Sequence, residues 1–318
     1  MVASTNLAGK RLGVLDLGSN TFKLLVADIT PEGFDVVYER SEYCRLGEGL
    51  FSTGNLSDEA IARSMQTLSA LVGHAAELNT TTVCAVGTSA LRASANSSTF
   101  LDRARNEHGL NIQVLSGEEE AALVFRGVCS DPQLSGRELL VMDLGGGSAE
   151  WILGNRHAIA NNASLDIGCV RMTERFFPGQ LPPPTDGVRQ LEAHLEMVLS
   201  PILEKFPLAS RTLVGTGGTL CCLACVMQPT FWDIMKTGGS FSSSRAALHD
   251  LTHLLLRRTL EELVATPGIP AKRADVIVAG AIIFRKVFAM LNADTFFVSN
   301  RGLRYGLMDR LAQAAHTA

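Results

Sequence analysis

Two short segments of this chain place an aspartate beside closely spaced glycine and hydroxyl residues, a composition suited to holding phosphate. They comprise Asp16, Gly18, Ser19 and Asn20 in the first segment and Asp143, Gly145, Gly146, Gly147 and Ser148 in the second. Glycine lets backbone N–H groups approach phosphate oxygens without a Cβ in the way. A single turn of this kind is equally well a tight hairpin, whereas a duplicated pair predicts two turns that point into one cleft.

A third glycine turn, Gly215-Thr216-Gly217-Gly218, precedes a helix expected from Thr219. The free N–H groups at a helix start suit an anion, although a simple packing turn has the same composition. Two aspartates that face one phosphate-filled cleft are natural ligands for Mg²⁺, a hard cation that prefers carboxylate and water oxygens. The sequence therefore predicts a magnesium site at Asp16 and Asp143.

The two aspartate segments lie in repeated surroundings. Each copy consists of a strand, the acidic glycine turn, a second strand, a turn and a third strand. The strands are expected at 12–15, 22–29 and 34–38 in the first copy, and at 139–142, 151–153 and near 158 in the second. The repeat predicts two related halves.

Helices and strands alternate through the rest of the chain. Ser57 is expected to cap a helix in which Ile61, Met65 and Leu68 recur at helical spacing. Further strands are expected at 81–86, 112–115, 211–214 and 296–299, and further helices at 99–107, 118–128, 246–263, 274–291 and 302–314, with a polar Gly/Ser stretch at 237–244. Such alternation predicts an α/β fold with parallel strands covered by helices.

Composition narrows the class of protein. The 318 residues suit two domains of ordinary size, and the apolar runs fall short of the roughly 18 residues that a membrane span needs. The N-terminal ten residues do not resemble a secretory signal, so the cytoplasm is expected. Seven cysteines, an odd number, argue against a disulfide framework, and a net charge of −4 does not suggest nucleic-acid binding.

Eight runs in this order resemble the exopolyphosphatase and guanosine-pentaphosphate phosphohydrolase (Ppx/GppA) family. They are LDLGSNTFKLLVA, GTSALRASAN, LSGEEEAALVFRGV, VMDLGGGSAEWILG, LDIGCVRMTERFF, LVGTGGT, RADVIVAG and VSNRGLRYGL. The resemblance covers nearly the whole chain and implies two actin-like, ribonuclease H-like domains with an interdomain active site. The implied domains are 1–124 with a closing helix at about 302–318, and 125–301.

The resemblance also assigns roles to acidic residues. Glu120 matches the carboxylate that activates the attacking water, a role that hydrolysis of a phosphoanhydride requires. The residues alone would not select it from Glu118, Glu119 and Glu120, which read as the solvated first turn of a helix. Asp143 matches the family's principal magnesium-ligating aspartate, Asp16 faces it from the first turn, and Glu150 matches a further catalytic acid that holds the metal or the water.

Phosphate contacts follow in the same way. The matching positions are Asp16, Gly18, Ser19, Asn20, Lys23, Arg92, Gly145, Gly146, Gly147, Ser148, Gly217 and Gly218. Without the resemblance, a surface salt bridge would be the simpler reading of Arg92. Tyr305 departs from the family pattern, which usually has Glu there.

The implied activity is exopolyphosphatase, with removal of the terminal phosphate of guanosine pentaphosphate as the alternative. A sugar or carboxylate kinase fits less well because of the acid at Glu120 and because no sugar-recognition insert is evident. A non-catalytic alarmone sensor fits less well because Glu120, Asp143 and Glu150 form a complete hydrolytic set. The chain ends soon after the second domain, as in short family members, so a weaker grip on long polyphosphate is expected. Assistance by potassium and formation of a homodimer stay open.

Overall fold

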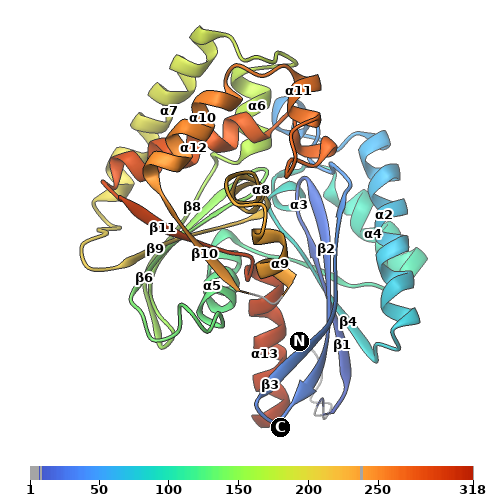
Figure 1. The fold of residues 1–318 in the computed structure, drawn as a ribbon. Coiled ribbons are helices and arrows are strands. Elements are labelled where there is room, and N and C mark those ends of the chain that lie inside the picture. The colour runs from blue at the N-terminus through green and yellow to red at the C-terminus, as the bar shows by residue number, and fades with distance from the viewer. Residues whose placement is uncertain (1–6, 8, 237–238, 318) are drawn as a thin grey trace. The chain divides into compact units, whose positions relative to one another are not determined.

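The computed structural model describes residues 7, 9–236 and 239–317 (Figure 1). The described residues form two compact units, the first extending to Ser130 and resuming at Leu303, and the second comprising Asp131–Gly302. A boundary after residue 124 would cut helix α5, Gly117–Cys129, whereas the units divide beyond the end of that helix. Thr237 and Gly238, from the expected polar stretch, lie outside the described residues.

The first unit contains a mixed sheet in the order β3-β2-β1-β4-β5. Its strands are β1 Arg11–Leu17, β2 Thr21–Thr30, β3 Gly33–Tyr43, β4 Thr82–Gly87 and β5 Ile112–Val114. The first three pair antiparallel, and β1, β4 and β5 are parallel. The predicted strand–turn–strand–turn–strand pattern is therefore present, with a β3 longer than expected.

The helices of the first unit cover this sheet. They are α1 Leu50–Thr53, α2 Asp58–Glu77, α3 Ser89–Ala93, α4 Ser97–His108, α5 and α13 Leu303–Thr317. The Ser57 hydroxyl accepts from the Ala60 amide at 3.1 Å, so the predicted cap of α2 is confirmed. Ile61, Met65 and Leu68 of α2 pack in a core that includes residues of β1, β2 and α4. Figure 1 shows α2 and α4 side by side.

The second unit contains a six-stranded mixed sheet in the order β10-β11-β9-β6-β7-β8. Its strands are β6 Leu139–Leu144, β7 Ala149–Asn155, β8 Ala158–Leu165, β9 Thr212–Thr216, β10 Ser240–Ser244 and β11 Thr295–Ser299. Its helices are α6 Cys169–Phe176, α7 Thr185–Leu203, α8 Gly218–Met227, α9 Phe231–Lys236, α10 Arg245–Leu255, α11 Leu260–Val264 and α12 Ile277–Met290, with a 3-10 turn at Ala271–Arg273. Both mixed sheets with their helices confirm the predicted α/β class.

Several elements of the second unit differ from expectation. The single helix expected at 246–263 is wrong, because Thr259 and Glu262 form a capping box that starts α11 separately from α10. Part of the polar stretch, Ser240–Ser244, is an edge strand paired antiparallel with β11. Gly215 and Thr216 belong to β9, which leaves Gly217 as the turn before α8.

None of the helices in the described part of the chain is both long and apolar enough to cross a bilayer.

Candidate active site

In the first unit, the candidate residues follow the carboxyl ends of three neighbouring parallel strands. Leu17 of β1 is the register partner of Gly87 in β4, and Gly87 is the partner of Val114 in β5. Beyond these ends lie the turn 18–20, helix α3 with Arg92, and helix α5 with Glu120. Ligand sites in α/β sheets form at such ends, so the topology gathers these residues at one edge of the sheet.

Asp16 is buried on β1 and faces Lys23, its cross-strand partner on β2. The Lys23 Nζ lies 3.4 Å from the Asp16 Oδ2. This separation is longer than a short charge-assisted hydrogen bond, but the two charges still offset each other. The structure thus pairs two of the predicted phosphate-site residues with each other.

The first glycine turn is held through its carbonyl groups. The carbonyl of Ser19 accepts from the Gly47 amide at 2.7 Å, and the carbonyl of Asn20 accepts from the amides of Cys44 and Arg45 at 3.2 and 3.0 Å. We call residues 44–47 the brace loop. Because a trans peptide points its N–H opposite its C=O, the Asn20 amide points away from this loop.

Two side chains of this turn carry buried polar atoms without a partner. The Ser19 Oγ and the Asn20 Nδ2 make no hydrogen bond within the described part of the chain. An unsatisfied buried donor costs free energy, so such atoms are expected where a ligand supplies the missing acceptor. A phosphate oxygen would meet that need.

The brace loop is itself fixed from helix α2. The Arg63 Nε donates to the Cys44 carbonyl at 2.6 Å, and the Arg63 Nη2 donates to the Arg45 carbonyl at 3.1 Å. Cys44 is buried, and burial raises the pKa of its thiol to about 11. Arg45 has a φ of 55°, a left-handed conformation that is unusual for a residue with a Cβ.

Glu120 lies in the first turn of α5 and is 7% exposed. The Arg92 Nη1 donates to both the Glu120 Oε2 and the Leu115 carbonyl, each at 2.8 Å. Glu119 is used differently, since its carboxylate accepts from the Ser116 amide at 2.8 Å in a capping box. Glu118 and Glu119 are exposed, in agreement with the predicted solvated first turn, whereas Glu120 faces inward.

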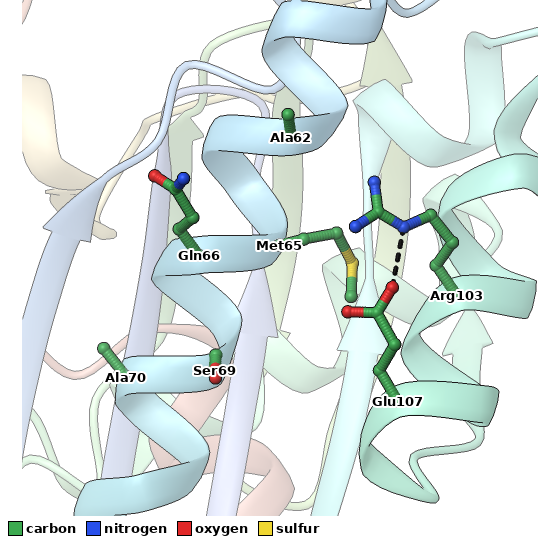
Figure 2. Close-up of a pocket in the computed structure, with 7 residues that line it drawn as sticks. All are labelled: Ala62, Met65, Gln66, Ser69, Ala70, Arg103 and Glu107. Atoms are coloured by element: carbon green, nitrogen blue, oxygen red, sulfur yellow. Dashed lines mark hydrogen bonds and ion pairs between the residues drawn. The ribbon is translucent and has the colours of Figure 1, made fainter.

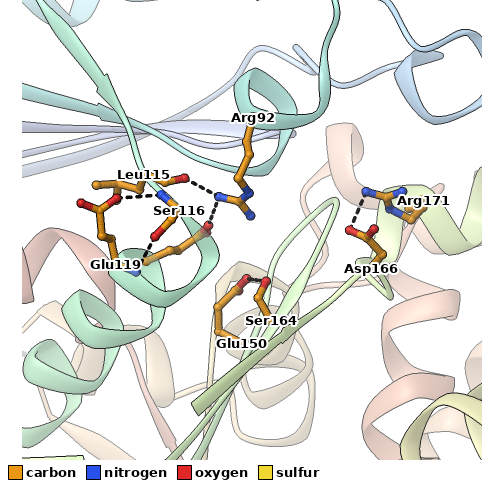
Figure 3. Close-up of polar contacts among 9 residues, drawn as sticks. Arg92, Leu115, Ser116, Glu119, Glu150, Ser164, Asp166 and Arg171 are labelled. Carbon is orange, nitrogen blue, oxygen red and sulfur yellow. Dashed lines mark hydrogen bonds and ion pairs between the residues drawn. The ribbon is translucent and has the colours of Figure 1, made fainter.

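In the second unit, polar side chains form a row across four strands. Asp143 of β6 is the register partner of Thr216 in β9 and of Glu150 in β7, and Glu150 is the partner of Ser164 in β8. Directly opposed residues share a face of the sheet. Glu150 is only 1% exposed and accepts from the Ser164 Oγ at 2.8 Å (Figure 3). The two predicted acids are therefore neighbours.

The second glycine turn is held by the first turn of α6. The carbonyl of Gly145 accepts from the Cys169 amide at 3.0 Å, that of Gly146 from the Val170 and Arg171 amides at 2.8 and 3.1 Å, and that of Gly147 from the Gly168 amide at 3.2 Å. Since these carbonyls face α6, the amides of the following residues, Gly146, Gly147 and Ser148, point the opposite way. Three successive N–H groups on one side make an anion cradle.

Two further glycines are required by this packing. A Cβ on Gly168 would lie 2.4 Å from backbone atoms of both Gly146 and Gly147. A Cβ on Gly217, which has a φ of 94°, would lie 2.6 Å from the Asp143 Oδ1. The third glycine turn therefore lies against the aspartate of the second turn. It belongs to the candidate site and is not a packing turn elsewhere in the fold.

Four residues close to these turns were not singled out from the sequence. Ser164 and Gly168 have no local signal that distinguishes them, although Gly168 falls in one of the family-like runs. The Arg171 Nε donates to the Gly147 carbonyl at 2.9 Å. Arg273 is 5% exposed, and its Nη1 donates to the Thr219 Oγ1 at 2.9 Å beside Gly218.

The expected magnesium ligands are the acidic side chains of Asp16, Asp143 and Glu150. No group of three or more His, Cys, Asp or Glu side chains suited to a metal occurs within the described ranges. Asp143 and Glu150 nevertheless oppose each other as like charges, which a cation would relieve, and Mg²⁺ commonly uses one or two carboxylates plus water and phosphate oxygens. This pair fits the ion, whereas Asp16 already faces Lys23.

The sequence of this chain resembles those of known proteins. The family model described as "Ppx/GppA phosphatase family" matches residues 25–315. "Exopolyphosphatase 2" of Mycobacterium tuberculosis is 34% identical over 300 residues, which cover 88% of this chain and 91% of the relative. "Guanosine-5'-triphosphate,3'-diphosphate pyrophosphatase" of Vibrio parahaemolyticus is 33% identical over 299 residues, which cover 92% of this chain but only 58% of the relative.

Solved structures give the same picture. The crystal structure of an exopolyphosphatase from Cytophaga hutchinsonii is similar with a TM-score of 0.89 at 29% sequence identity, and the match covers 96% of this chain and 98% of that one. The likeness extends over both units and supports the predicted two-domain α/β architecture.

Proposed function

Since this chain belongs to the Ppx/GppA phosphatase family, we propose that it is an exopolyphosphatase, which hydrolyses the terminal phosphoanhydride bond of inorganic polyphosphate. The observation that carries the proposal is the second glycine turn, where the amides of Gly146, Gly147 and Ser148 point away from α6 beside the paired acids Asp143 and Glu150. This arrangement combines donors for phosphate oxygens with ligands for a cation. The first turn adds the unpaired donors of Ser19 and Asn20.

In the proposed mechanism Glu120 accepts the proton of the attacking water. Its carboxylate is buried and oriented by the Arg92 Nη1, which keeps one oxygen engaged. Within the described residues, the Arg92 Nε and Nη2 make no hydrogen bond, so the same guanidinium can hold Glu120 and donate to a phosphate. A base held in this way contributes typically 10²- to 10⁴-fold to a hydrolysis rate, as an order of magnitude.

Asp143 and Glu150 would hold Mg²⁺. The expected role of Asp16 as a further ligand stays a prediction. When bound, the ion neutralises charge on the phosphate oxygens and on the leaving group. Lys23 beside Asp16 would supply a positive charge along the path of the substrate. The need for Mg²⁺ and any assistance by potassium are part of this proposal.

We propose polyphosphate as the substrate ahead of guanosine pentaphosphate because of how much of each named relative this chain spans. The relative that this chain matches over 91% of its length is named an exopolyphosphatase. The relative named for the guanosine nucleotide is matched over only 58% of its length. Its sequence identity to this chain, 33%, is close to the 34% of the exopolyphosphatase, so guanosine pentaphosphate stays the alternative substrate. A cytoplasmic location and a homodimer stay predictions.

Glu120→Gln tests the proposal. Phosphate release from polyphosphate, guanosine pentaphosphate and ATP should be measured side by side, with and without magnesium. We expect polyphosphate to be the best substrate, magnesium to be required, and Glu120→Gln to lose about a thousandfold in kcat while it still binds polyphosphate. Undiminished turnover by this variant would refute the role of Glu120.

Glu119→Gln is the matched control. This neighbouring acid caps α5 and is exposed, and glutamine can also close a capping box. The variant should therefore lose only about 0.5 kcal/mol of the free energy of unfolding, from the weaker interaction with the helix dipole, without a comparable loss of kcat.

A further inference from the structure

We propose that Arg171 is a positioning residue, which orients the amide cradle of the second glycine turn without contacting phosphate itself. The inference rests on the proposed function, because it assumes that a phosphate group occupies this cradle. Arg171 lies in the first turn of α6, and its side chain reaches back to the turn that α6 holds.

The contact is made to one particular peptide group. The Arg171 Nε donates to the Gly147 carbonyl at 2.9 Å. The Gly168 amide donates to the same carbonyl over a longer distance, 3.2 Å. The C=O of Gly147 and the N–H of Ser148 belong to the same planar peptide, so fixing one fixes the direction of the other. Arg171 therefore controls the last of the three cradle amides.

The other end of the guanidinium is anchored. The Arg171 Nη2 donates to the Asp166 Oδ1 at 2.8 Å (Figure 3), and the Arg171 side chain is 22% exposed. A planar guanidinium held at Nε and Nη2 has a fixed orientation, which an ammonium group cannot reproduce. The anchor explains why the side chain points at the turn and does not extend into solvent.

The charge has a second effect on the cradle. A cation that donates to the Gly147 carbonyl polarises the peptide, so the Ser148 N–H on its opposite side becomes a stronger donor. A phosphate on the cradle would benefit from both the direction and the polarisation. Arg171 thus acts through the Gly147–Ser148 peptide.

The test measures binding of tripolyphosphate by calorimetry, without divalent ions so that no turnover occurs. We expect Arg171→Met to weaken binding about tenfold, the value of one charge-assisted hydrogen bond. Arg175→Met is the matched control, because Arg175 lies one turn further along α6 and contacts His194 and Phe176. It should bind within about twofold of the unaltered protein.

Arg171→Lys separates positioning from simple attraction. It keeps the positive charge but loses the two-point geometry, so it should bind nearly as weakly as Arg171→Met. Asp166→Ala, which removes the anchoring carboxylate at an exposed position, should weaken binding about threefold and serves if the arginine variants do not fold. In turnover assays, Arg171→Met should raise KM more than it lowers kcat, an effect that partial unfolding does not produce.

Contrary outcomes are distinct. Equal binding by Arg171→Met and the unaltered protein, full recovery by Arg171→Lys, or no tripolyphosphate binding at all would overturn the inference. If the Arg171 variants bind tripolyphosphate as weakly as expected but the unaltered protein does not hydrolyse polyphosphate, the exopolyphosphatase function is refuted and the role of Arg171 stands.

Discussion

The glycine hairpins of the two units begin with the same pattern but place different residues across from their aspartates. Asp16 faces Lys23 on the neighbouring strand, whereas Asp143 faces Glu150 at the corresponding register. The first pair is electrically balanced, and the second concentrates negative charge. The duplicated backbone motif thus carries two charge patterns: both turns present donors suited to phosphate, and only the second also has two acids in register, where we propose the cation.

The supports of the two turns differ as well. The brace loop holds the first turn by two of its carbonyls and leaves the side-chain donors of Ser19 and Asn20 unpaired. The start of α6 holds three successive carbonyls of the second turn and so directs backbone amides outward. The first turn therefore offers side-chain donors to a phosphate, whereas the second offers backbone amides whose direction α6 sets. This difference determines which substitutions each turn should tolerate.

The largest expected effect separates the two aspartates. Asp143→Asn removes half of the acidic pair and should lower kcat on the order of a thousandfold, with a higher magnesium concentration for half-maximal activity. Asp16→Asn should lower kcat less and shift the magnesium requirement less, because Lys23 already offsets that charge. Magnesium titrations of activity check both variants. An equal shift in the two would remove the proposed division of roles.

A smaller effect should separate the two supports. Gly168→Ala places a Cβ 2.4 Å from the backbone of the second turn, so the turn must shift, and we expect a loss of about a hundredfold in kcat/KM. Gly47→Ala is the matched variant in the brace loop. Its Cβ would meet the Ser19 Cβ at 3.0 Å, and a loss of only a few-fold is expected. Circular dichroism during heating would show whether either variant is unfolded under assay conditions; a Gly47→Ala loss as large as that of Gly168→Ala would contradict the comparison.

The smallest effect concerns the unpaired donors. The Ser19 Oγ has no partner in the described structure, so Ser19→Ala should leave the free energy of unfolding unchanged or slightly higher. The same change should raise KM for polyphosphate about threefold, because a donor to phosphate is lost. Denaturant unfolding and steady-state kinetics measure the two quantities. A clear loss of stability would mean that the hydroxyl has a structural role.

Elements with strong local signals were predictable from the sequence. The apolar runs before Asp16 and Asp143 gave β1 and β6, and Ser57 gave the start of α2. Helices α6 and α7 were not predicted because they begin after Gly168 and Pro184, neither of which provides a side-chain cap. The break between α10 and α11 had a readable capping box, which the long apolar pattern obscured.

The site was predictable in its residues but less so in its contacts. Composition and repetition pointed to both glycine turns, whereas the selection of Glu120 depended on family resemblance. The Arg92–Glu120 pair, the Arg171 contact and the packing of Gly217 on Asp143 all join segments far apart in the sequence. Such contacts depend on how strands align, which local patterns do not specify.

The buried thiol of Cys44 makes the brace loop observable without any substitution. With a pKa of about 11 this side chain is almost entirely protonated at neutral pH, and it is closed to solvent in the native loop. Alkylating reagents can therefore reach it only when the brace loop opens, and the Cys44 amide of that loop is one of the donors to the Asn20 carbonyl. The rate of Cys44 labelling therefore reports how often the brace loop opens. A phosphate chain bound at the first turn should lower that rate.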